Sequence, residues 1–320
     1  MTRSAIITAI LLAAIGAAGC GGGRDGQAEE AAPTQDLSHL SGAIKADGSS
    51  TVGPLTTLAA ERFRAQAPDV RITVGVSGTG GGFEKFCNGE TDLQNASRPI
   101  KDEEAAICRA NGVDYVEFRV ATDALTVVVN TSNAWADCLT VDQLKAIWEP
   151  GSDIDSWSGV PGGDYPDVAL ELAGPGTDSG TFDYFTDEIV GEEGASRTDY
   201  QASEDDNVVV EAVAGQEGGL GYFGFSYYDQ NTDRLKAVAI DGGEGCVEPS
   251  IATAQSGEYQ PLARPLFLYA KTASFANEHV HEFVSFYLTR AVELAEDALY
   301  VPLTAEEQEK ALADFDAAGP

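Results

Sequence analysis

The sequence predicts an α/β protein whose two lobes each contain a mostly parallel sheet and are joined by strands that cross between them. Two observations predict this fold class. Short apolar strands alternate with amphipathic helices along most of the chain, and a Gly/Ser-rich turn separates several of the strands from the helix that follows. Because neighbouring parallel strands need a crossover connection, this alternation is typical of parallel sheets covered by helices.

The first lobe begins with three such units. Their strands are expected at residues 43–46, 71–76 and 92–96, and their helices at residues 55–66, 82–87 and 102–110. The strands are short apolar runs, whereas the helices repeat their apolar residues with a period near 3.6. We therefore expect the three strands to lie in one mostly parallel sheet.

The second lobe follows the apolar runs at residues 115–120 and 125–130. Its strands are expected at residues 168–173 and 219–223, and its helices at residues 140–148, 180–189 and 207–214. A last strand at residues 261–269 leads to a long helix at residues 277–297, whose apolar stripe indicates a buried face. The lobes then comprise residues 40–122 with 262–320, and residues 123–261, with a hinge near Thr122 and Pro261.

The N-terminus has the pattern of an export signal. Arg3 precedes an apolar run at residues 5–18 that is too short to span a bilayer comfortably, so residues 1–19 are expected to be a signal peptide. Residues 20–39 are rich in Gly, Ala, Glu and Gln and show no periodicity, which predicts a flexible tether.

The end of the export signal resembles a bacterial lipobox. Residues 17–20 read AAGC, and small residues before a cysteine are typical of the site where the thiol receives a lipid. The resemblance predicts lipidation of Cys20 and an extracytoplasmic protein anchored to the cell membrane. Ordinary secretory cleavage is the alternative, because Ala17 stands where a lipobox usually has Leu.

The composition is that of an acidic globular protein. The 320 residues include 52 acidic and 19 basic side chains, which gives a net charge of −33, and 43% of the residues are hydrophobic. This hydrophobic content is sufficient for real cores and excludes disorder of the body. The negative charge disfavours nucleic acid and anionic membranes as partners.

Four cysteines besides Cys20 predict two disulfides, because disulfides persist in the oxidising space to which an exported chain travels. Three connectivities are possible. We favour Cys87 with Cys108 and Cys138 with Cys246, since each pair then lies within one lobe and leaves the hinge free. No CxxC or His-rich spacing accompanies them, so no metal site is expected.

Serine, threonine and glycine concentrate in three turns, at residues 47–51, 77–82 and 174–181, each after a predicted strand and before or at the start of a helix. Carboxyl ends of parallel strands meet at one edge of a sheet, where helix N-termini offer unpaired N–H groups. Hydroxyls add directional donors without charge. The three turns therefore predict an oxyanion site, and Arg98, at the end of another strand, is the expected counter-charge.

Six segments in this order resemble the PstS-type phosphate-binding proteins. The segments are DGSSTVGPL (47–55), SGTGGGFEKF (77–86), NASRPI (95–100), GPGTDSGTFDYF (174–185), SEDDN (203–207) and GGLGYFGFSYY (218–228). The resemblance implies a type II periplasmic-binding-protein fold that closes on inorganic phosphate and delivers it to an ABC-type permease. It also implies a monomer without a cofactor and without enzymatic activity.

The same resemblance assigns the phosphate-binding residues by motif. With Arg98, they are expected to be Ser50, Thr51 and the N–H of Val52 from the first turn, Thr79 from the second, and Asp178, Ser179, Gly180 and Thr181 from the third.

One departure from the family leaves the proton acceptor open. Better-known members have an acidic residue where this chain has Arg98, and an arginine where it has Pro175. A buried carboxylate facing the anion would favour protonated phosphate over sulfate. Asp178 and Asp47 are the candidates, because each lies in a predicted phosphate turn, and Asp205 is the third; a simple capping role is the alternative for each.

Two other functions fit parts of the pattern. A receptor for sulfate, molybdate or tungstate would use the same helix N-termini but gain nothing from a carboxylate. A phosphatase would need a metal cluster or an activated nucleophile, whereas His39, His279 and His281 lie far from the glycine-rich turns. The sequence therefore favours a binding protein.

Overall fold

The computed structural model describes residues 36–177 and 179–319. Within these ranges the chain has two large hydrophobic cores. One takes its residues from the chain up to Ala121 and from Leu266 onward, and the other mainly from the segment between them. The predicted signal peptide, Cys20, most of the tether and Asp178 lie outside the described residues.

The first lobe consists of three strand–helix units and a C-terminal group of helices. The units contain β1 (Ser41–Gly48), α1 (Gly53–Arg64), β2 (Asp69–Val74), α2 (Gly78–Cys87), β3 (Leu93–Ala96) and α3 (Asp102–Ala110). The C-terminal group contains η3 (Thr272–Ala276), α9 (Glu278–Thr289), α10 (Ala291–Asp297) and α11 (Ala305–Ala318). Because β1 pairs in parallel with both β2 and β3, the predicted parallel arrangement of these units is confirmed.

The second lobe contains more and shorter elements. Its strands are β5 (Cys138–Thr140), β6 (Glu171–Pro175), β7 (Gln201–Ser203), β8 (Gly219–Gly224), β9 (Leu235–Ala237), β10 (Ala239–Asp241) and β11 (Cys246–Val247). Its helices are α4 (Val141–Trp148), η1 (Trp157–Gly159), α5 (Gly180–Phe185), the π-helical turn η2 (Thr186–Val190), α6 (Asp206–Ala214), α7 (Phe225–Asp229) and α8 (Ile251–Ser256). β6 pairs in parallel with β7 and β8.

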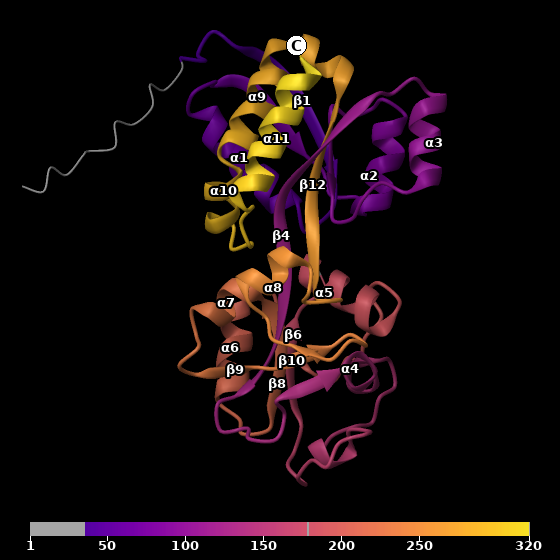
Figure 1. Ribbon diagram of the computed structural model, residues 1–320, viewed down its shortest axis with the longest axis vertical. Coiled ribbons are helices and arrows are strands. Elements are labelled where there is room, and N and C mark those ends of the chain that lie inside the picture. The colour runs from indigo at the N-terminus through magenta and orange to yellow at the C-terminus, as the bar shows by residue number, and fades with distance from the viewer. Residues whose placement is uncertain (1–35, 178, 320) are drawn as a thin grey trace, which may run out of the picture. The chain divides into compact units, whose positions relative to one another are not determined.

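Two long strands, β4 (Tyr115–Asn130) and β12 (Ala263–Lys271), connect the lobes. They run antiparallel, side by side, at the centre of a sheet with the order β2-β1-β3-β12-β4-β8-β6-β7, to which β9 is added beside β4 (Figure 1). The two strands expected at residues 115–120 and 125–130 are therefore one strand. The four residues between them include no glycine or proline, so nothing interrupts the extended backbone.

The C-terminal region differs from the prediction in two ways. The helix expected at residues 277–297 is divided into α9 and α10 at Arg290, whose φ of −108° and ψ of 13° leave the helical region. Beyond it, Val301 exchanges backbone hydrogen bonds with Thr122 and packs in the second core, although its position in the chain assigns it to the first lobe. The segment after α10 thus pairs with β4, one of the two crossing strands.

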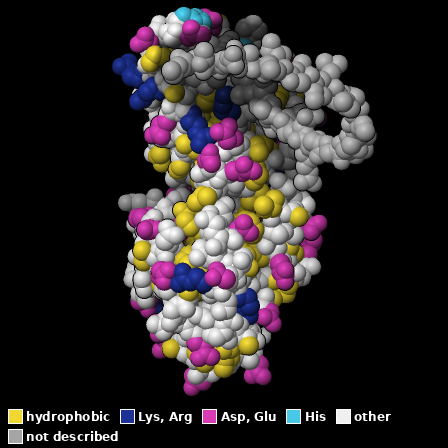
Figure 2. Space-filling model, turned by 90° about the vertical axis from the view of Figure 1, so that its left-hand side faces the viewer, with side chains coloured by type: hydrophobic (Ala, Val, Ile, Leu, Met, Phe, Trp, Pro, Cys, Tyr) yellow, Lys and Arg dark blue, Asp and Glu magenta, His cyan; other side chains and the backbone are white. Residues whose placement is uncertain are grey.

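The surface carries the acidic charge of the sequence. Figure 2 shows Asp and Glu side chains distributed over the face that it presents. No helix in residues 36–177 and 179–319 combines the length and apolarity that a membrane crossing requires.

Both predicted disulfides are confirmed. Cys87 and Cys108 connect α2 with α3, and Cys138 and Cys246 connect β5 with β11. Neither bond links the two cores, so closure of one lobe on the other is not restrained by a covalent bridge.

Removing each disulfide should cost more stability the longer the loop that it closes, with a logarithmic dependence on loop length. The separations are 108 residues for Cys138–Cys246 and 21 residues for Cys87–Cys108. Loop-closure entropy predicts a loss of about 4–5 kcal/mol in the free energy of unfolding for the Cys138→Ser/Cys246→Ser pair, and ~3 kcal/mol for Cys87→Ser/Cys108→Ser. Urea unfolding of the two double variants measures both values, and the reverse order would contradict the expectation.

Candidate functional site

A polar cavity of about 450 Å³ lies between the two lobes, beside the crossing strands. Its walls come from the N-termini of α1 and α2, the end of β3, the α5–η2 segment and β12. The residues that line it are Ser49, Ser50, Thr51, Ser77, Gly78, Thr79, Gly80, Gly81, Ser97, Arg98, Lys101, Asp183, Tyr184, Asp187, Glu188, Glu193 and Arg264.

The turn between β1 and α1 forms one wall. Ser49 donates its N–H to the carbonyl oxygen of Asn95 at 2.9 Å, and its hydroxyl accepts the N–H of Thr51 at 3.2 Å. Glycine is required at position 48, because its φ is +133° and a Cβ there would lie 2.1 Å from the Asn95 oxygen. The turn therefore holds Ser50 and Thr51 at the N-terminus of α1, where N–H groups lack helical partners.

The N-terminus of α2 forms the neighbouring wall. The helix begins at Gly78, four residues before the predicted start, so the glycine-rich turn supplies the first helical N–H groups themselves. Thr79 lines the cavity, and its hydroxyl accepts the N–H of Ser97 at 3.2 Å and lies 3.0 Å from the Ser97 hydroxyl. A Cβ at Gly82 would lie 2.5 Å from the Cα of Gly48, so glycine allows α2 to approach β1 this closely.

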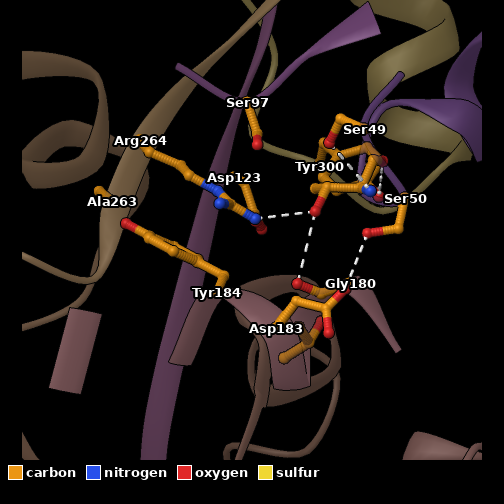
Figure 3. Close-up of polar contacts among 12 residues, drawn as sticks. Ser49, Ser50, Ser97, Asp123, Gly180, Asp183, Tyr184, Ala263, Arg264 and Tyr300 are labelled. Atoms are coloured by element: carbon orange, nitrogen blue, oxygen red, sulfur yellow. Dashed lines mark hydrogen bonds and ion pairs between the residues drawn. The ribbon is translucent and has the colours of Figure 1, made fainter. Parts of the chain in front are cut away.

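Arg264, on β12, provides a positive charge that the sequence analysis did not select. Its Nη2 donates to the Thr51 hydroxyl at 2.8 Å, and its Nε lies 3.4 Å from Oδ2 of Asp123, the residue opposite it on β4. Its Cζ lies 3.6 Å from the centroid of the Tyr184 ring in the second lobe. Figure 3 shows Arg264 among these residues. The guanidinium thus contacts both lobes and both crossing strands.

The partner carboxylate of Arg264 is buried. The Asp123 side chain is 5% exposed, and burial raises its pKa, an effect that the neighbouring guanidinium only partly offsets. Because the pair sits on the two crossing strands, Arg264 keeps its position at the end of the cavity by contacts that belong to neither lobe alone. The sequence signal that could have identified Arg264 is its position, three residues after the predicted hinge residue Pro261.

Arg98 lines the cavity, but its charge is already engaged. Its guanidinium donates to both carboxylate oxygens of Glu104, at 2.9 and 2.7 Å, and this contact raises the pKa of Arg98. Glu104 also accepts the N–H of Lys101 at 2.8 Å as part of the cap of α3. Arg98 is therefore held by two short hydrogen bonds to a carboxylate, whereas the contact between Arg264 and Asp123 is single and longer, at 3.4 Å.

The second lobe meets the first at Gly180 and Asp183. The Thr51 hydroxyl donates to the Gly180 carbonyl oxygen at 3.4 Å, and the Ser50 hydroxyl donates to Oδ2 of Asp183 at 3.1 Å. A Cβ at Gly180 would lie 2.7 Å from the Thr51 hydroxyl, so the absence of a side chain permits this contact. Three further carboxylates line the same wall, those of Asp187, Glu188 and Glu193.

Comparison with known proteins identifies the family. A family model described as the PBP superfamily domain matches residues 27–291. The chain belongs to this family. It is 46% identical to protein SphX of Synechococcus elongatus over 279 residues, which is 86% of this chain and 81% of SphX. It is 39% identical to the phosphate-binding protein PstS of Staphylococcus saprophyticus over 291 residues, 90% of this chain and 86% of that protein.

Solved structures of this periplasmic-binding-protein family share the fold. A possible phosphate binding protein from Planctomyces limnophilus has a TM-score of 0.84 and 45% identity, over 88% of this chain and 100% of that one. An ABC-type phosphate transport receptor from Vibrio cholerae has a TM-score of 0.63 and 22% identity, over 81% of this chain and 99% of that one. These likenesses confirm the type II fold expected from the sequence.

The binding-protein cavity contains some of the residues predicted for it and lacks others. Ser50, Thr51, Thr79 and Arg98 line it. Gly180 contacts Thr51 at its edge. Gly180 and three other predicted residues are not among the lining residues: Val52 is fully buried at the start of α1, Ser179 caps α5 by accepting the N–H of Thr181, and Thr181 lies in that helix.

Two of the three candidate proton acceptors lie outside the cavity lining. The carboxylate of Asp47 accepts hydrogen bonds from Lys85 at 2.7 Å, from Ser77 at 2.5 Å and from the N–H of Gly48 at 2.8 Å. Burial acts to raise the pKa of Asp47, but the hydrogen bonds from Lys85 and Ser77 lower it below its ordinary value. Asp205 caps α6 through the N–H of Asn207 at 3.0 Å. Asp205 therefore has the capping role that the sequence analysis gave as the alternative. The Asp47 carboxylate is instead occupied by hydrogen bonds from other residues of the first lobe.

The sequence analysis did not select several of the residues that line the cavity. They are Ser49, Ser77, Ser97, Lys101, Asp183, Tyr184, Asp187, Glu188, Glu193 and Arg264. Three of the hydroxyls lie in motifs already recognised as glycine- and serine-rich, so proximity to those motifs was a usable signal. The described part of the chain has no group of three or more His, Cys, Asp or Glu side chains arranged to hold a metal ion.

Proposed function

We propose that this protein binds inorganic phosphate outside the cytoplasm and delivers it to an ABC-type permease. The observation that carries the proposal is the position of Arg264, whose guanidinium faces a cavity walled by the N-termini of α1 and α2. A full positive charge and two helix N-termini that converge on one space favour a multiply charged oxyanion.

The donors of the first lobe suit a tetrahedral ligand. The hydroxyls of Ser50, Thr79 and Ser97 come from three different turns, and the N–H groups of Gly78 to Gly81 come from the first turn of α2. Hydroxyl and amide donors bind oxygen atoms without adding charge, so they complement Arg264. Relatives named for phosphate binding support phosphate among the possible oxyanions.

The carboxylates of the second lobe argue against a fully ionised oxyanion such as sulfate. Burial raises the pKa of Asp183, so this carboxylate sits in a setting that disfavours additional negative charge. A ligand that keeps a proton can donate it to a carboxylate, whereas sulfate cannot. This chemistry favours phosphate over sulfate, molybdate and tungstate.

Binding without catalysis is the proposed activity. The described residues that line the cavity include neither histidine nor cysteine. His39 and His281 contact Glu278 and Glu282 instead. A phosphatase would need a nucleophile with an adjacent base or a metal cluster. The relatives named as phosphate-binding proteins support binding as the activity.

The proposed location and partner follow from the N-terminus and the family. The export signal supports a position outside the cytoplasm, and the lipobox-like residues before Cys20 support a lipid anchor in the membrane that contains the permease. We propose that the receptor acts as a monomer with phosphate as its ligand.

Calorimetric titration of the purified protein from residue 36 onward, after removal of bound ligand, tests this function. We expect one phosphate per chain and an affinity for sulfate that is weaker by about 100-fold or more, equivalent to ~2.7 kcal/mol. Equal affinities would indicate a different oxyanion receptor. No binding of either anion would contradict the proposal.

A further inference from the structure

The linker between α10 and α11, residues 298–304, contacts the anion-binding turn of the first lobe. The hydroxyl of Tyr300 in this linker donates to the carbonyl oxygen of Thr51 at 2.6 Å. Figure 3 shows Tyr300 at this turn, with Ser49 and Ser50. Burial raises the pKa of Tyr300, so the hydroxyl keeps its proton and remains a donor. The α10–α11 linker thus has a direct hydrogen bond to a residue that lines the cavity.

This hydrogen bond orients the peptide that joins Thr51 to Val52. The peptide is trans, so it is planar and its C=O and N–H point in opposite directions. By holding the carbonyl, Tyr300 also fixes the direction of the Val52 N–H. Among the described residues that N–H has no hydrogen-bond partner, whereas the N–H groups of Ser49, Thr51 and Gly53 are paired. Tyr300 therefore orients a backbone donor that is free to bind an anion.

The second lobe and a crossing strand hold the same linker. The hydroxyl of Ser226 on α7 donates to the carbonyl oxygen of Leu299 at 2.9 Å. The amide of Gln255 on α8 donates to the carbonyl oxygen of Pro302 at 2.8 Å. Between them, Val301 is buried in the second core and pairs with β4. The second lobe thus places the linker, while the tyrosine of the linker reaches the first lobe.

The backbone at Leu299 shows that the linker is held in one conformation by its contacts. Its φ of +63° lies in the left-handed region, which residues with a side chain rarely adopt. Such a conformation persists where the surrounding contacts determine it. Here the N–H of Leu299 donates to the carbonyl oxygen of Glu296 at 3.1 Å, and its own carbonyl accepts the Ser226 hydroxyl. A shift of the second lobe would therefore move the linker with it.

From these contacts we propose that Tyr300 is a positioning residue for the bound anion, which transmits the position of the second lobe to the Thr51–Val52 peptide through the α10–α11 linker. The inference rests on the phosphate-binding function proposed above. It makes the linker a third connection between the lobes, besides β4 and β12, and one that ends on the backbone of the anion-binding turn. Approach of the lobes and binding of the anion then favour each other.

The first test removes the hydroxyl and keeps the ring. In Tyr300→Phe we expect calorimetric titration to show phosphate affinity lower by about tenfold, because the peptide loses the hydrogen bond that orients it. Tyr287→Phe is the matched control. The Tyr287 hydroxyl lies 3.2 Å from that of Thr56 on α1, which is outside the cavity lining. This control also loses a buried hydrogen bond, so it should lower the melting temperature and leave phosphate affinity unchanged.

The second test addresses the path through the linker. Ser226→Ala/Gln255→Ala removes two side-chain contacts of the second lobe with the linker, and both residues lie outside the cavity lining. We expect this double variant to bind phosphate about 3- to 10-fold more weakly. Adding Tyr300→Phe to it should weaken binding no further than Tyr300→Phe alone, because the path to the turn is then already broken. Independent structural roles would instead make the two losses multiply.

The outcomes separate this inference from the function on which it rests. If wild type binds phosphate and Tyr300→Phe binds it equally well, the role of Tyr300 is refuted while phosphate binding stands. An equal loss in Tyr287→Phe, or losses that multiply in the combined variant, also overturns the inference. If wild type binds no phosphate, both fail. Should Tyr300→Phe not fold, Ser226→Ala/Gln255→Ala decides, since weaker phosphate binding supports the inference and wild-type affinity overturns it.

Discussion

Replacing Arg264 with glutamine is expected to weaken phosphate binding by about 100- to 1000-fold, or ~3–4 kcal/mol. The guanidinium supplies a full positive charge at a side chain that is 17% exposed, where solvent screens it little. Its loss also leaves Asp123 buried without its partner, which places an uncompensated negative charge at the end of the cavity. Calorimetric titration with phosphate measures the effect.

Arg98→Gln is the matched comparison. Arg98 lines the same cavity, but Glu104 takes two of its hydrogen bonds, so we expect its loss to weaken phosphate binding by about tenfold or less. The double variant Arg264→Gln/Asp123→Asn separates folding from binding, because it removes both members of the buried pair. We expect it to recover stability but not affinity. A strong loss in Arg98→Gln with near-normal binding in Arg264→Gln would reverse the assignment.

Replacing Gly180 with alanine is expected to weaken phosphate binding by about 10- to 100-fold, through loss of the contact between the lobes. A Cβ at Gly180 would lie 2.7 Å from the Thr51 hydroxyl and 2.9 Å from the Thr51 nitrogen. Overpacking of this kind costs about 1–3 kcal/mol, and here the cost arises only when the lobes meet. Phosphate affinity should therefore fall while the melting temperature of the ligand-free protein stays nearly constant.

Gly224→Ala provides the control for Gly180→Ala. Gly224 has a φ of −61° and a ψ of 140°, which alanine adopts readily, and the nearest atom to a Cβ there is 4.0 Å away. We expect this variant to bind phosphate like wild type. Wild-type affinity in Gly180→Ala would show that Thr51 and Gly180 need not meet for the anion to bind.

Much of the architecture could be predicted from local pattern. The strand–helix alternation predicts the parallel units, and even cysteine numbers with a two-lobe interpretation predict both disulfides. What the pattern missed were elements with little periodicity, such as β7, β9 and β11, each of two or three residues. The helix α11 was also missed, although Thr304 and Glu307 form a capping box at its start.

The candidate site, like the fold, was predicted only in part from local pattern. The sequence by itself determined the glycine-rich turns that place Ser50, Thr51 and Thr79 at helix N-termini, because such turns are local chemistry encoded by adjacent residues. Local pattern also predicts an export signal at the N-terminus.

Only the tertiary structure decided which charges line the cavity. Arg264 reaches Thr51 across 213 residues of sequence, and Asp183 reaches Ser50 across 133. The order β1-β3-β12 within the sheet sets the first contact, and approach of the two lobes sets the second. Asp47 lies in one of the turns predicted to bind phosphate, but its carboxylate forms an ion pair with Lys85 instead. Electrostatic partners depend on distance in space, and no local pattern in the chain encodes that distance.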